Sequence, residues 1–470
     1  MKIFQKEPFL NTKLLLDKEC NLNKAIEIGS RLELMVDDFL IERMSGIQLH
    51  LQTPREMPLA DSPLLEAAYA TVIKDNDLYR AYYRQMIPGY NGPSEDGNDG
   101  EITCYAESHD GIEWLKPDLG IYEINGSHAN NVVLHESPFC HNFSPFLDAR
   151  PDKGRGKRFK AMAGSHEKKG GLYAFESEDG IHWTKMQDRP VITSEKFAFD
   201  SQNVAFWSVA ENCYVCYCRT WLRTPRTPIG DLRSISRRTS ADFLNWSEPV
   251  ETNPNLPGED IYTSQTHPYF RAPHIYIALP TRYMAGRVGE QNTHAMLGST
   301  DILLMTSRAG STTYARPFKE AFIRPGLDPA RWKNRANYAA LNVVPTSPSE
   351  MTIYHSKSGH RHVLRTDGFV SARAGFTKGE LLTKVLTFSG KELILNYSTS
   401  AAGGMRIEIQ DANGAPFSGF RLDDCHEIIG DEIERRVDWK QKPDPGALQG
   451  KPVRLRFVMA ECDLYSFRFV

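Results

Sequence analysis

Short apolar stretches with an alternating pattern recur along most of this chain. The segment "AAYATVIKDNDLYRAYYR" (67–84) is an apolar strand, a polar turn and a second, aromatic strand. The same plan recurs in residues 143–164, 200–219, 262–282 and 334–356. Alternation bounded by turn residues predicts a β-hairpin in each case. Helical periodicity is nearly absent before the closing segments, so the pattern predicts an all-β fold.

A short motif, Ser-x-Asp-Gly-x-x-Trp, follows these hairpins. It reads "SHDGIEW" at 108–114, "SEDGIHW" at 177–183 and "SADFLNW" at 240–246, with a decayed copy from Ser307 and an echo, "RTDGFVS", from Arg365. The copies are spaced by 69, 63, 67 and 58 residues. Repeats of this period built from four short strands each predict a five-bladed β-propeller. Two unrelated β-sandwiches would not explain the period.

The residue types of the motif suit a structural turn. The Asp carboxylate can accept hydrogen bonds from backbone N–H groups of its own turn. The Gly supplies a positive φ without steric cost, and the Trp can bury its ring between blades. We therefore interpret Asp110 and Asp179 as turn residues and not as catalytic acids.

The sequence pattern changes after Arg365. Short alternating strands broken by Gly and Asn-Gly turns predict an appended β-sandwich. The predicted organisation is an N-terminal extension (1–30), a five-bladed propeller (31–365) and a C-terminal β-sandwich (366–470). We expect the strand-like segment "RLELMVDDFLIE" (31–42) to complete the outer edge of a blade and so close the ring.

Composition narrows the class of partner. A net charge of −3 argues against a nucleic-acid binder. No stretch approaches the roughly 18 apolar residues of a membrane span, and no secretory leader is recognisable, so we expect a cytoplasmic protein; a mature fragment of an exported protein is the alternative. The eight cysteines include "CYVCYC" (213–218), whose members we expect in a strand core and not at a metal. No cofactor motif is found.

Candidate functional residues follow from propeller geometry, in which the first strand of each blade starts, and the second ends, at one face of the central channel. We place a set of acids there as candidate catalytic groups. They are Asp148, Asp200, Glu66 and Asp260, with Glu259 competing for the role of Asp260. The candidate substrate-binding residues are Arg84, Arg150, Arg219, Arg282, His267, Arg335 and Asn337.

This mixture of groups suits a sugar. Paired carboxylates can share the acid and base or nucleophile roles at a glycosidic bond, and arginines can hold hydroxyl or carboxylate groups. Tyr69, Trp207 and Tyr262 are candidates for stacking on sugar rings. The structural alternative is that the arginines pair with carboxylates between blades.

Five segments carry a family resemblance: "CYAESHDGIEWLKPDLG", "NFSPFLDARP", "FDSQNVAFW", "EAFIRPGLDPARWKNRANY" and "TDGFVSARAG". From about residue 31 the chain resembles bacterial proteins related to the N-terminal domain of glycoside hydrolase family 32, and so families 43 and 68. The resemblance implies a five-bladed propeller with a C-terminal sandwich. It also implies three channel acids: Glu66 or Asp38, then Asp148 and Asp200. The repeated motif is similar to the Asp-box of sialidases, which use an arginine triad and a Tyr nucleophile.

The sequence thus predicts a glycoside hydrolase, exo-acting on a terminal sugar, with two or three channel carboxylates and neither metal nor cofactor. A carbohydrate is the expected partner; nucleic acid and membrane are not, and a homo-oligomer formed through the sandwich is possible. Two alternatives stay open. One is a non-catalytic carbohydrate-binding propeller, and the other is a sialidase-like hydrolase that uses the channel arginines.

Overall fold

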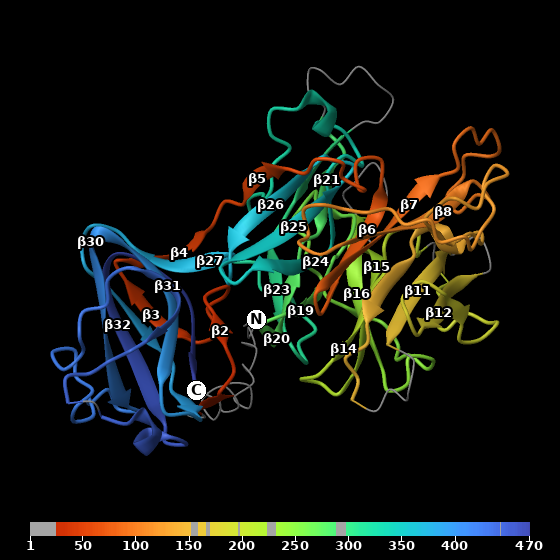
Figure 1. Cartoon of the computed structure of the whole chain (residues 1–470). Coiled ribbons are helices and arrows are strands. Elements are labelled where there is room, and N and C mark those ends of the chain that lie inside the picture. Colours follow the sequence, from red (N-terminus) through yellow and green to blue (C-terminus); the bar gives the residue numbers. More distant parts are fainter. Residues whose placement is uncertain are drawn as a thin grey trace, which may run out of the picture. The chain divides into compact units, whose positions relative to one another are not determined.

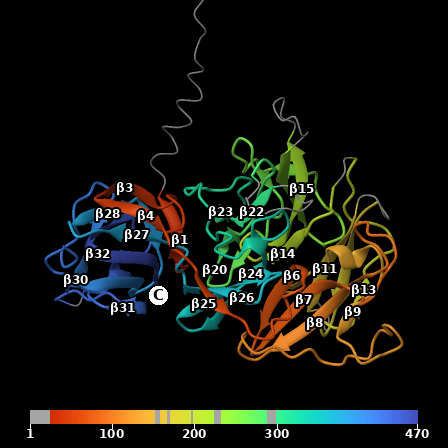
Figure 2. The same ribbon diagram turned by 90° about the horizontal axis from the view of Figure 1, so that it is seen from above.

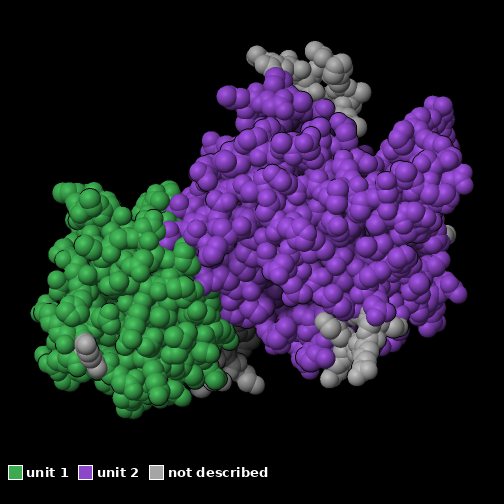
Figure 3. Space-filling model, viewed as in Figure 1, with its two compact units in different colours: residues 1–50, 370–470 green, residues 51–369 purple. Residues whose placement is uncertain are grey.

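The computed structural model describes residues 25–151, 158–165, 170–195, 198–222, 232–287, 298–441 and 443–470. In these ranges the regular elements are β-strands and three short 3₁₀ turns, which confirms the all-β prediction. The chain divides into two compact units (Figure 3): unit 1 comprises residues 1–50 and 370–470, and unit 2 comprises residues 51–369.

Unit 2 begins with three antiparallel meanders of four strands each. The first comprises β6 (Ala68–Asp75), β7 (Leu78–Met86), β8 (Glu101–Ser108) and β9 (Val132–Leu134). The second comprises β10 (Ser144–Leu147), β11 (Phe159–Ser165), β12 (Gly171–Ser177) and β13 (Thr184–Lys185). The third comprises β14 (Val204–Ser208), β15 (Cys213–Leu222), β16 (Leu232–Ser240) and β17 (Val250–Glu251).

The rest of unit 2 is less regular. Two three-stranded sheets follow, β18 (Asp260–Ile261) with β21 (Thr281–Met284) and β22 (Ser299–Ile302), and β19 (His267–Tyr269) with β20 (Ala272–Ala278) and β23 (Met305–Arg308). The last antiparallel group is β24 (Tyr338–Ser347), β25 (Glu350–Ser356), β26 (His360–Arg365) and β5 (Arg55–Pro58).

The first strands of successive sheets contact one another in a closed series: β6 with β10, β10 with β14, β14 with β19, β19 with β24, and β24 with β6. β24 and β6 lie side by side (Figure 2), joined by a parallel bridge between Leu341 and Thr71. Radial sheets around a common centre are the architecture of a β-propeller. Because the fourth region is divided between two sheets, the count of five blades stays a prediction.

The segment that completes the last group of strands is not the expected one. Strand β5 pairs with β26, from His360 opposite Pro58 to Val363 opposite Arg55. Residues 31–42, expected in this role, belong to unit 1, where β2 (Glu33–Leu34) pairs with β32 (Val453–Phe469). Their apolar side chains, including Met35 and Leu40, are buried in the core of that unit.

Unit 1 is built around two long strands, β30 (Leu393–Asp411) and β32, which pair along most of their length. Eight shorter strands join them in one ten-stranded sheet: β1 (Ile26–Gly29), β2, β3 (Ile41–Ser45), β4 (Ile47–Leu51), β27 (Val370–Ala374), β28 (Gly379–Thr383), β29 (Leu386–Phe388) and β31 (Asp431–Arg436). Figure 1 shows them around one core. Since the pairing is continuous, the two layers of a sandwich stay a prediction, and the boundary on the N-terminal side lies near residue 50 instead of 31.

The repeated motif forms the turn that its chemistry predicts. Asp110 accepts hydrogen bonds from the backbone N–H groups of Ile112 at 2.7 Å and Glu113 at 2.8 Å. Gly111 has a φ of +74°, and its carbonyl accepts the Tyr354 hydroxyl at 2.6 Å from the neighbouring sheet.

The second copy repeats this arrangement. Asp179 receives the N–H groups of Ile181 and His182, each at 2.8 Å, and Tyr82 donates to the Gly180 carbonyl at 2.9 Å. Each turn is thereby fastened to an adjacent sheet, which is a structural role.

Cys216 and Cys218 are buried on one face of β15, as predicted from the alternation, with their sulfur atoms 3.4 Å apart. Among the described residues, no group of three or more His, Cys, Asp or Glu side chains is placed to hold a metal ion. The described part of the chain also contains no helix with the length and apolar character to cross a membrane.

Candidate active site

A pocket of about 90 Å³ opens where the first strands of unit 2 begin. Its polar and aromatic lining residues are Tyr69, Arg84, Asp96, His141, Arg335, Tyr338 and Lys357. Tyr69 is near the start of β6, Arg84 near the end of β7, and Tyr338 at the start of β24. The ends of separate strands therefore converge on one pocket, as propeller geometry predicts.

His141 stands at the base of this site, 2% exposed. It ends a single 3₁₀ turn (Phe139–His141) two residues before β10. Its Nδ1 lies 2.9 Å from the Oε1 of Glu101, the first residue of β8, and its Nε2 lies 3.0 Å from the Asp200 carbonyl oxygen. Glu101 also accepts the Gly97 N–H at 3.1 Å and forms an ion pair with Arg84 at 3.1 Å. Glu101 thus fixes the position of both the imidazole and the guanidinium.

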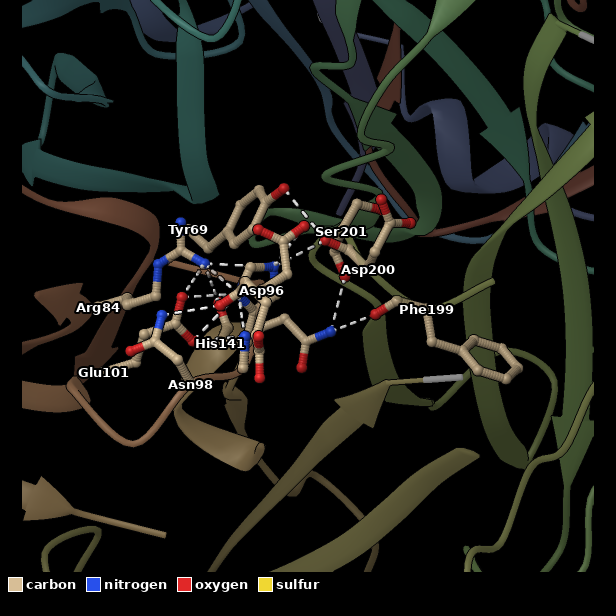
Figure 4. A network of polar contacts seen from close by, with 12 residues as sticks. Tyr69, Arg84, Asp96, Asn98, Glu101, His141, Phe199, Asp200 and Ser201 are labelled. Atoms are coloured by element: carbon tan, nitrogen blue, oxygen red, sulfur yellow. Dashed lines mark hydrogen bonds and ion pairs between the residues drawn. The ribbon is translucent and has the colours of Figure 1, made fainter. Parts of the chain in front are cut away.

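Two further acidic residues contact this imidazole (Figure 4), Asp96 through its carboxylate and Asp200 through its main-chain carbonyl. The Asp96 Oδ2 is 3.8 Å from the His141 Nε2, and the Asp96 side chain keeps 42% of its surface exposed. The carboxylate of Asp200 forms an ion pair with one terminal nitrogen of Arg219. The other terminal nitrogen of Arg219 donates a hydrogen bond to the Tyr262 carbonyl at 2.9 Å. The guanidinium of Arg219 is buried, so it orients Asp200 rigidly.

Three tyrosines form the aromatic wall. The rings of Tyr69 and Tyr338 lie 5.7 Å apart, as do those of Tyr338 and Tyr262. Burial, followed by the proximity of the other tyrosines, raises the pKa of Tyr69 and of Tyr338 well above the ordinary value, so both phenols stay neutral. The guanidinium of Arg84 lies 5.0 Å from the centre of the Tyr69 ring.

Two pocket residues have a backbone conformation that is uncommon for side-chain-bearing residues. Tyr69 has a φ of +47° and Arg335 a φ of +60°. A left-handed conformation in a non-glycine residue costs on the order of 1–3 kcal/mol and is concentrated at functional sites. The surrounding structure therefore holds both side chains at the pocket against their local preference.

The structure brings several of the predicted residues together. Arg84 and Arg335 line the pocket, and Asp200 with Arg219 lies directly beside it. Glu66 is exposed near the rim, where its charge acts on Lys357. For these residues the expected placement at the starts of first strands and the ends of second strands is observed.

Asp148 is not placed as predicted. It follows the end of β10 instead of beginning it, is fully buried, and accepts the Tyr214 hydroxyl at 2.8 Å beside Lys160 at 3.2 Å. Arg150 is close to it in the chain and lies over the ring of Trp207, with 5.5 Å between the guanidinium carbon and the ring centre. Asp148 therefore does not serve as a catalytic acid, and Trp207 does not offer its ring to a sugar, because both side chains already contact neighbouring residues.

His267 and Asn337 are also structural. The Nδ1 of His267 lies 2.8 Å from the Gln265 carbonyl, and its Nε2 accepts the Val343 N–H at 3.0 Å. Burial lowers the pKa of His267 to about 4, so the ring is neutral at physiological pH. The side-chain amide of Asn337 donates to the carbonyls of Thr300 and Arg331. Both residues tie neighbouring segments together.

The remaining predicted acids are committed to arginines outside the pocket. Asp260 accepts the Arg233 N–H at 2.8 Å and pairs with its guanidinium at 3.2 Å. Glu259 binds Arg282, which also holds Asp301 at 2.6 Å. The Asp260–Arg233 pair joins β18 to β16 of another sheet, as the structural alternative describes, whereas Arg282 and Asp301 pair within one sheet.

Asp38, the alternative first acid implied by the family resemblance, belongs to unit 1 and not to the sheets around the pocket.

Sequence reasoning missed five residues of the site: Asp96, Glu101, His141, Tyr338 and Lys357. The rule that selects the starts of first strands points to His141 once β10 is known to begin at Ser144. Asp96 and Glu101 come from the connection before a third strand, which that rule does not cover.

The fold and site define a propeller-type all-β protein with an acidic and basic pocket at the hub of its sheets. No protein-family model and no curated protein sequence matches the chain.

Solved structures similar to it include a glycoside hydrolase (14% identity, 67% of this chain and 92% of that chain, TM-score 0.43). A family 43 arabinoxylan arabinofuranohydrolase from Bacillus subtilis is 13% identical over 87% of this chain and 97% of its own, with a TM-score of 0.40. A fructofuranosidase from Schwanniomyces occidentalis is 10% identical over 88% and 96%, with a TM-score of 0.40.

Proposed function

We propose that the protein is a carbohydrate-active enzyme that hydrolyses a glycosidic bond at a terminal sugar, with Asp96 and Asp200 as its two working carboxylates. One observation carries the proposal. His141 contacts both residues, since its Nε2 lies 3.8 Å from the Asp96 carboxylate and 3.0 Å from the main-chain carbonyl of Asp200, so Asp96 lines the pocket and Asp200 lies beside it. Most glycoside hydrolases use two carboxyl groups that flank the scissile bond.

The surroundings of the two acids differ, which favours different roles. Asp200 is held in an ion pair by the buried Arg219, which fixes the position of its carboxylate and suits a base or nucleophile. Asp96 is partly exposed beside the imidazole of His141 and suits proton exchange with a leaving group. Glu101 acts as a positioning residue, because it holds His141 and Arg84 but does not line the pocket.

The shape of the site supports action on a chain end. The pocket encloses about 90 Å³, less than the roughly 300–1,000 Å³ usual for small-molecule sites, so it suits one terminal residue and not an extended chain. Its aromatic wall, formed by Tyr69 and Tyr338, gives a sugar ring an apolar surface to pack against.

A sialidase-like mechanism is less well supported, since it needs an activated tyrosine. Burial raises the pKa of Tyr69 and opposes formation of a phenolate nucleophile.

The decisive experiment is a screen of the purified protein on aryl glycosides and oligosaccharides, followed by the variants Asp96→Asn and Asp200→Asn. Each variant removes one carboxylate, and we expect hydrolysis to fall by roughly 10²–10⁴-fold, the usual contribution of a positioned acid or base. Asp188→Asn is the matched control, because Asp188 is exposed and outside the pocket. Thermal unfolding of all three variants separates a loss of catalysis from a loss of folding.

Activity that persists in both pocket variants would refute the site assignment. Binding of a sugar by the wild-type protein without turnover of any glycoside would identify a carbohydrate-binding propeller instead.

A further inference from the structure

The lining of the active-site pocket carries more positive than negative charge. Arg84, Arg335 and Lys357 face one carboxylate, that of Asp96. The two nearby acids are already committed, Glu101 to Arg84 at 3.1 Å and Asp200 to Arg219. The described residues around the pocket therefore leave Arg335 and Lys357 facing the single carboxylate of Asp96, an excess of one positive charge.

Neither of these two side chains has a carboxylate partner in contact. Within the described part of the chain, Arg335 and Lys357 form no side-chain hydrogen bond and no ion pair, and Asp96 and Glu66 act on them only at longer range. An unpaired guanidinium that is half-buried loses hydration without gaining a partner, which is unfavourable unless an anion completes the site.

The positive charges around the pocket act on the ammonium group of Lys357. Desolvation, followed by repulsion from Arg84, Arg335 and Lys333, lowers the pKa of Lys357 below its ordinary value, and the charge of Glu66 acts in the opposite direction. The pocket thus has a positive potential that a bound anion would relieve.

A second observation is independent of charge. The hydroxyl of Tyr338 is buried and has no hydrogen-bond partner among the described residues, although the residue is 3% exposed and lines the same pocket. Buried hydroxyl groups are almost always hydrogen-bonded, and leaving one unpaired is costly. An oxygen of a bound ligand would satisfy it.

The position of Arg335 is fixed by the fold. Its left-handed φ of +60° lies in a segment held by the side chain of Asn337, which donates to the carbonyls of Arg331 at 2.7 Å and Thr300 at 2.8 Å. A strained residue held in this way at a pocket is preorganised, and preorganised cations bind anions without an ordering cost.

We propose that this pocket selects sugars that carry an oxyanion, a carboxylate or a sulfate ester, with Arg335 and Lys357 as the anion-binding pair and the Tyr338 hydroxyl as an additional donor. The guanidinium can engage two oxygens of either group at once, and the ammonium adds a point charge. This inference rests on the proposed glycosidase function, because it names the substrate class of the same site.

The test measures binding by titration calorimetry and saturation-transfer NMR, so that it does not depend on turnover. The carboxylate arm uses glucuronate and galacturonate, the sulfate arm uses glucose 6-sulfate and galactose 6-sulfate, and glucose and galactose are the neutral controls. We expect at least one charged arm to bind about 10-fold or more tightly than the matching neutral sugar, with an affinity that falls as salt is added.

Variants locate the effect. We expect Arg335→Gln and Lys357→Met each to reduce the charged-to-neutral ratio by about 10-fold. Lys116→Met is the matched control, because Lys116 is an exposed lysine of unit 2 that lies outside the pocket lining and is not among the charges that act on Lys357; its ratio should stay within about 2-fold of wild type.

The inference is overturned if neutral sugars bind as tightly as charged ones, if neither class binds, or if the two pocket variants keep the wild-type ratio. Its failure is distinguishable from failure of the proposed function. Selective binding of acidic sugars without hydrolysis upholds the inference and refutes the glycosidase, whereas hydrolysis of neutral glycosides without acidic preference does the reverse.

Discussion

Asp148 offers a sharp test, because the sequence places it in catalysis and the structure places it in a core ion pair. Its carboxylate is fully buried and bound by Lys160 at 3.2 Å and by the Tyr214 hydroxyl at 2.8 Å. In Asp148→Asn the buried ammonium of Lys160 loses its counter-charge. Removing one partner of a buried ion pair costs about 3–5 kcal/mol, so we expect the free energy of unfolding of unit 2 to fall by that amount.

The assay is urea unfolding followed by tryptophan fluorescence. Six of the seven tryptophans, all except Trp439, belong to unit 2, so the signal reports mainly on that unit. The double variant Asp148→Asn/Lys160→Met removes both charges, and we expect it to be more stable than Asp148→Asn alone by at least about 1 kcal/mol.

An Asp148→Asn protein that unfolds at the wild-type urea concentration but has lost hydrolytic activity would refute this reasoning and restore Asp148 to the catalytic set. A double variant that shows the plain sum of the two single losses would contradict the ion pair itself.

Two further predictions concern the repeated turns. Partial burial acts to raise the pKa of Asp242, but hydrogen bonds from the Asn245 backbone and side chain outweigh it and lower that pKa to about 2. A depressed carboxyl pKa stabilises the fold above the unfolded-state value of 3.8 and loses this contribution as pH falls through 2. The melting temperature of Asp242→Asn should therefore converge on that of wild type between about pH 4 and pH 2; a constant gap would contradict the assignment. In Tyr82→Phe the Gly180 carbonyl loses a donor at 2.9 Å, and we expect a loss of about 1 kcal/mol in urea unfolding. Tyr90→Phe, whose hydroxyl makes no hydrogen bond among the described residues, should cost less than half of that, and equal costs would count against the turn contact.

The features that could be predicted from the sequence are the local ones. The turn around Asp110 is specified by hydrogen bonds that span three residues, so its chemistry is visible in the motif alone. The convergence of Arg84, Asp200 and Arg219 was predictable because alternate strands of a meander start and end at the same face.

The errors arise where a few residues change the end of a strand. Strand β10 has four residues, and at about 3.3 Å per residue this moves the chain roughly 13 Å from one end to the other. The sequence pattern places Asp148 at the start of β10, which is the end near the pocket, but Asp148 follows the last residue of that strand and is buried. The residue that precedes the strand on the pocket side, His141, was therefore missed. Asp96 lies in a connection without periodicity, shaped by contacts such as Gly97 N–H to Glu101 and Gly100 N–H to Asn98.

Unit 2 is an insertion within unit 1, and this has a consequence for synthesis of the protein. The insert enters and leaves at neighbouring positions, since the Gln52 N–H donates to the Phe369 carbonyl at 3.0 Å. Strands β3 and β4 find their partners only in β27 and β28, after residues 51–369 have been made. At about 5–20 residues per second this delay is roughly 15–60 s. During this interval the nascent β3 and β4 have exposed edges, so residues 41–51 are most open to mispairing while the inserted unit 2 can form its own sheets.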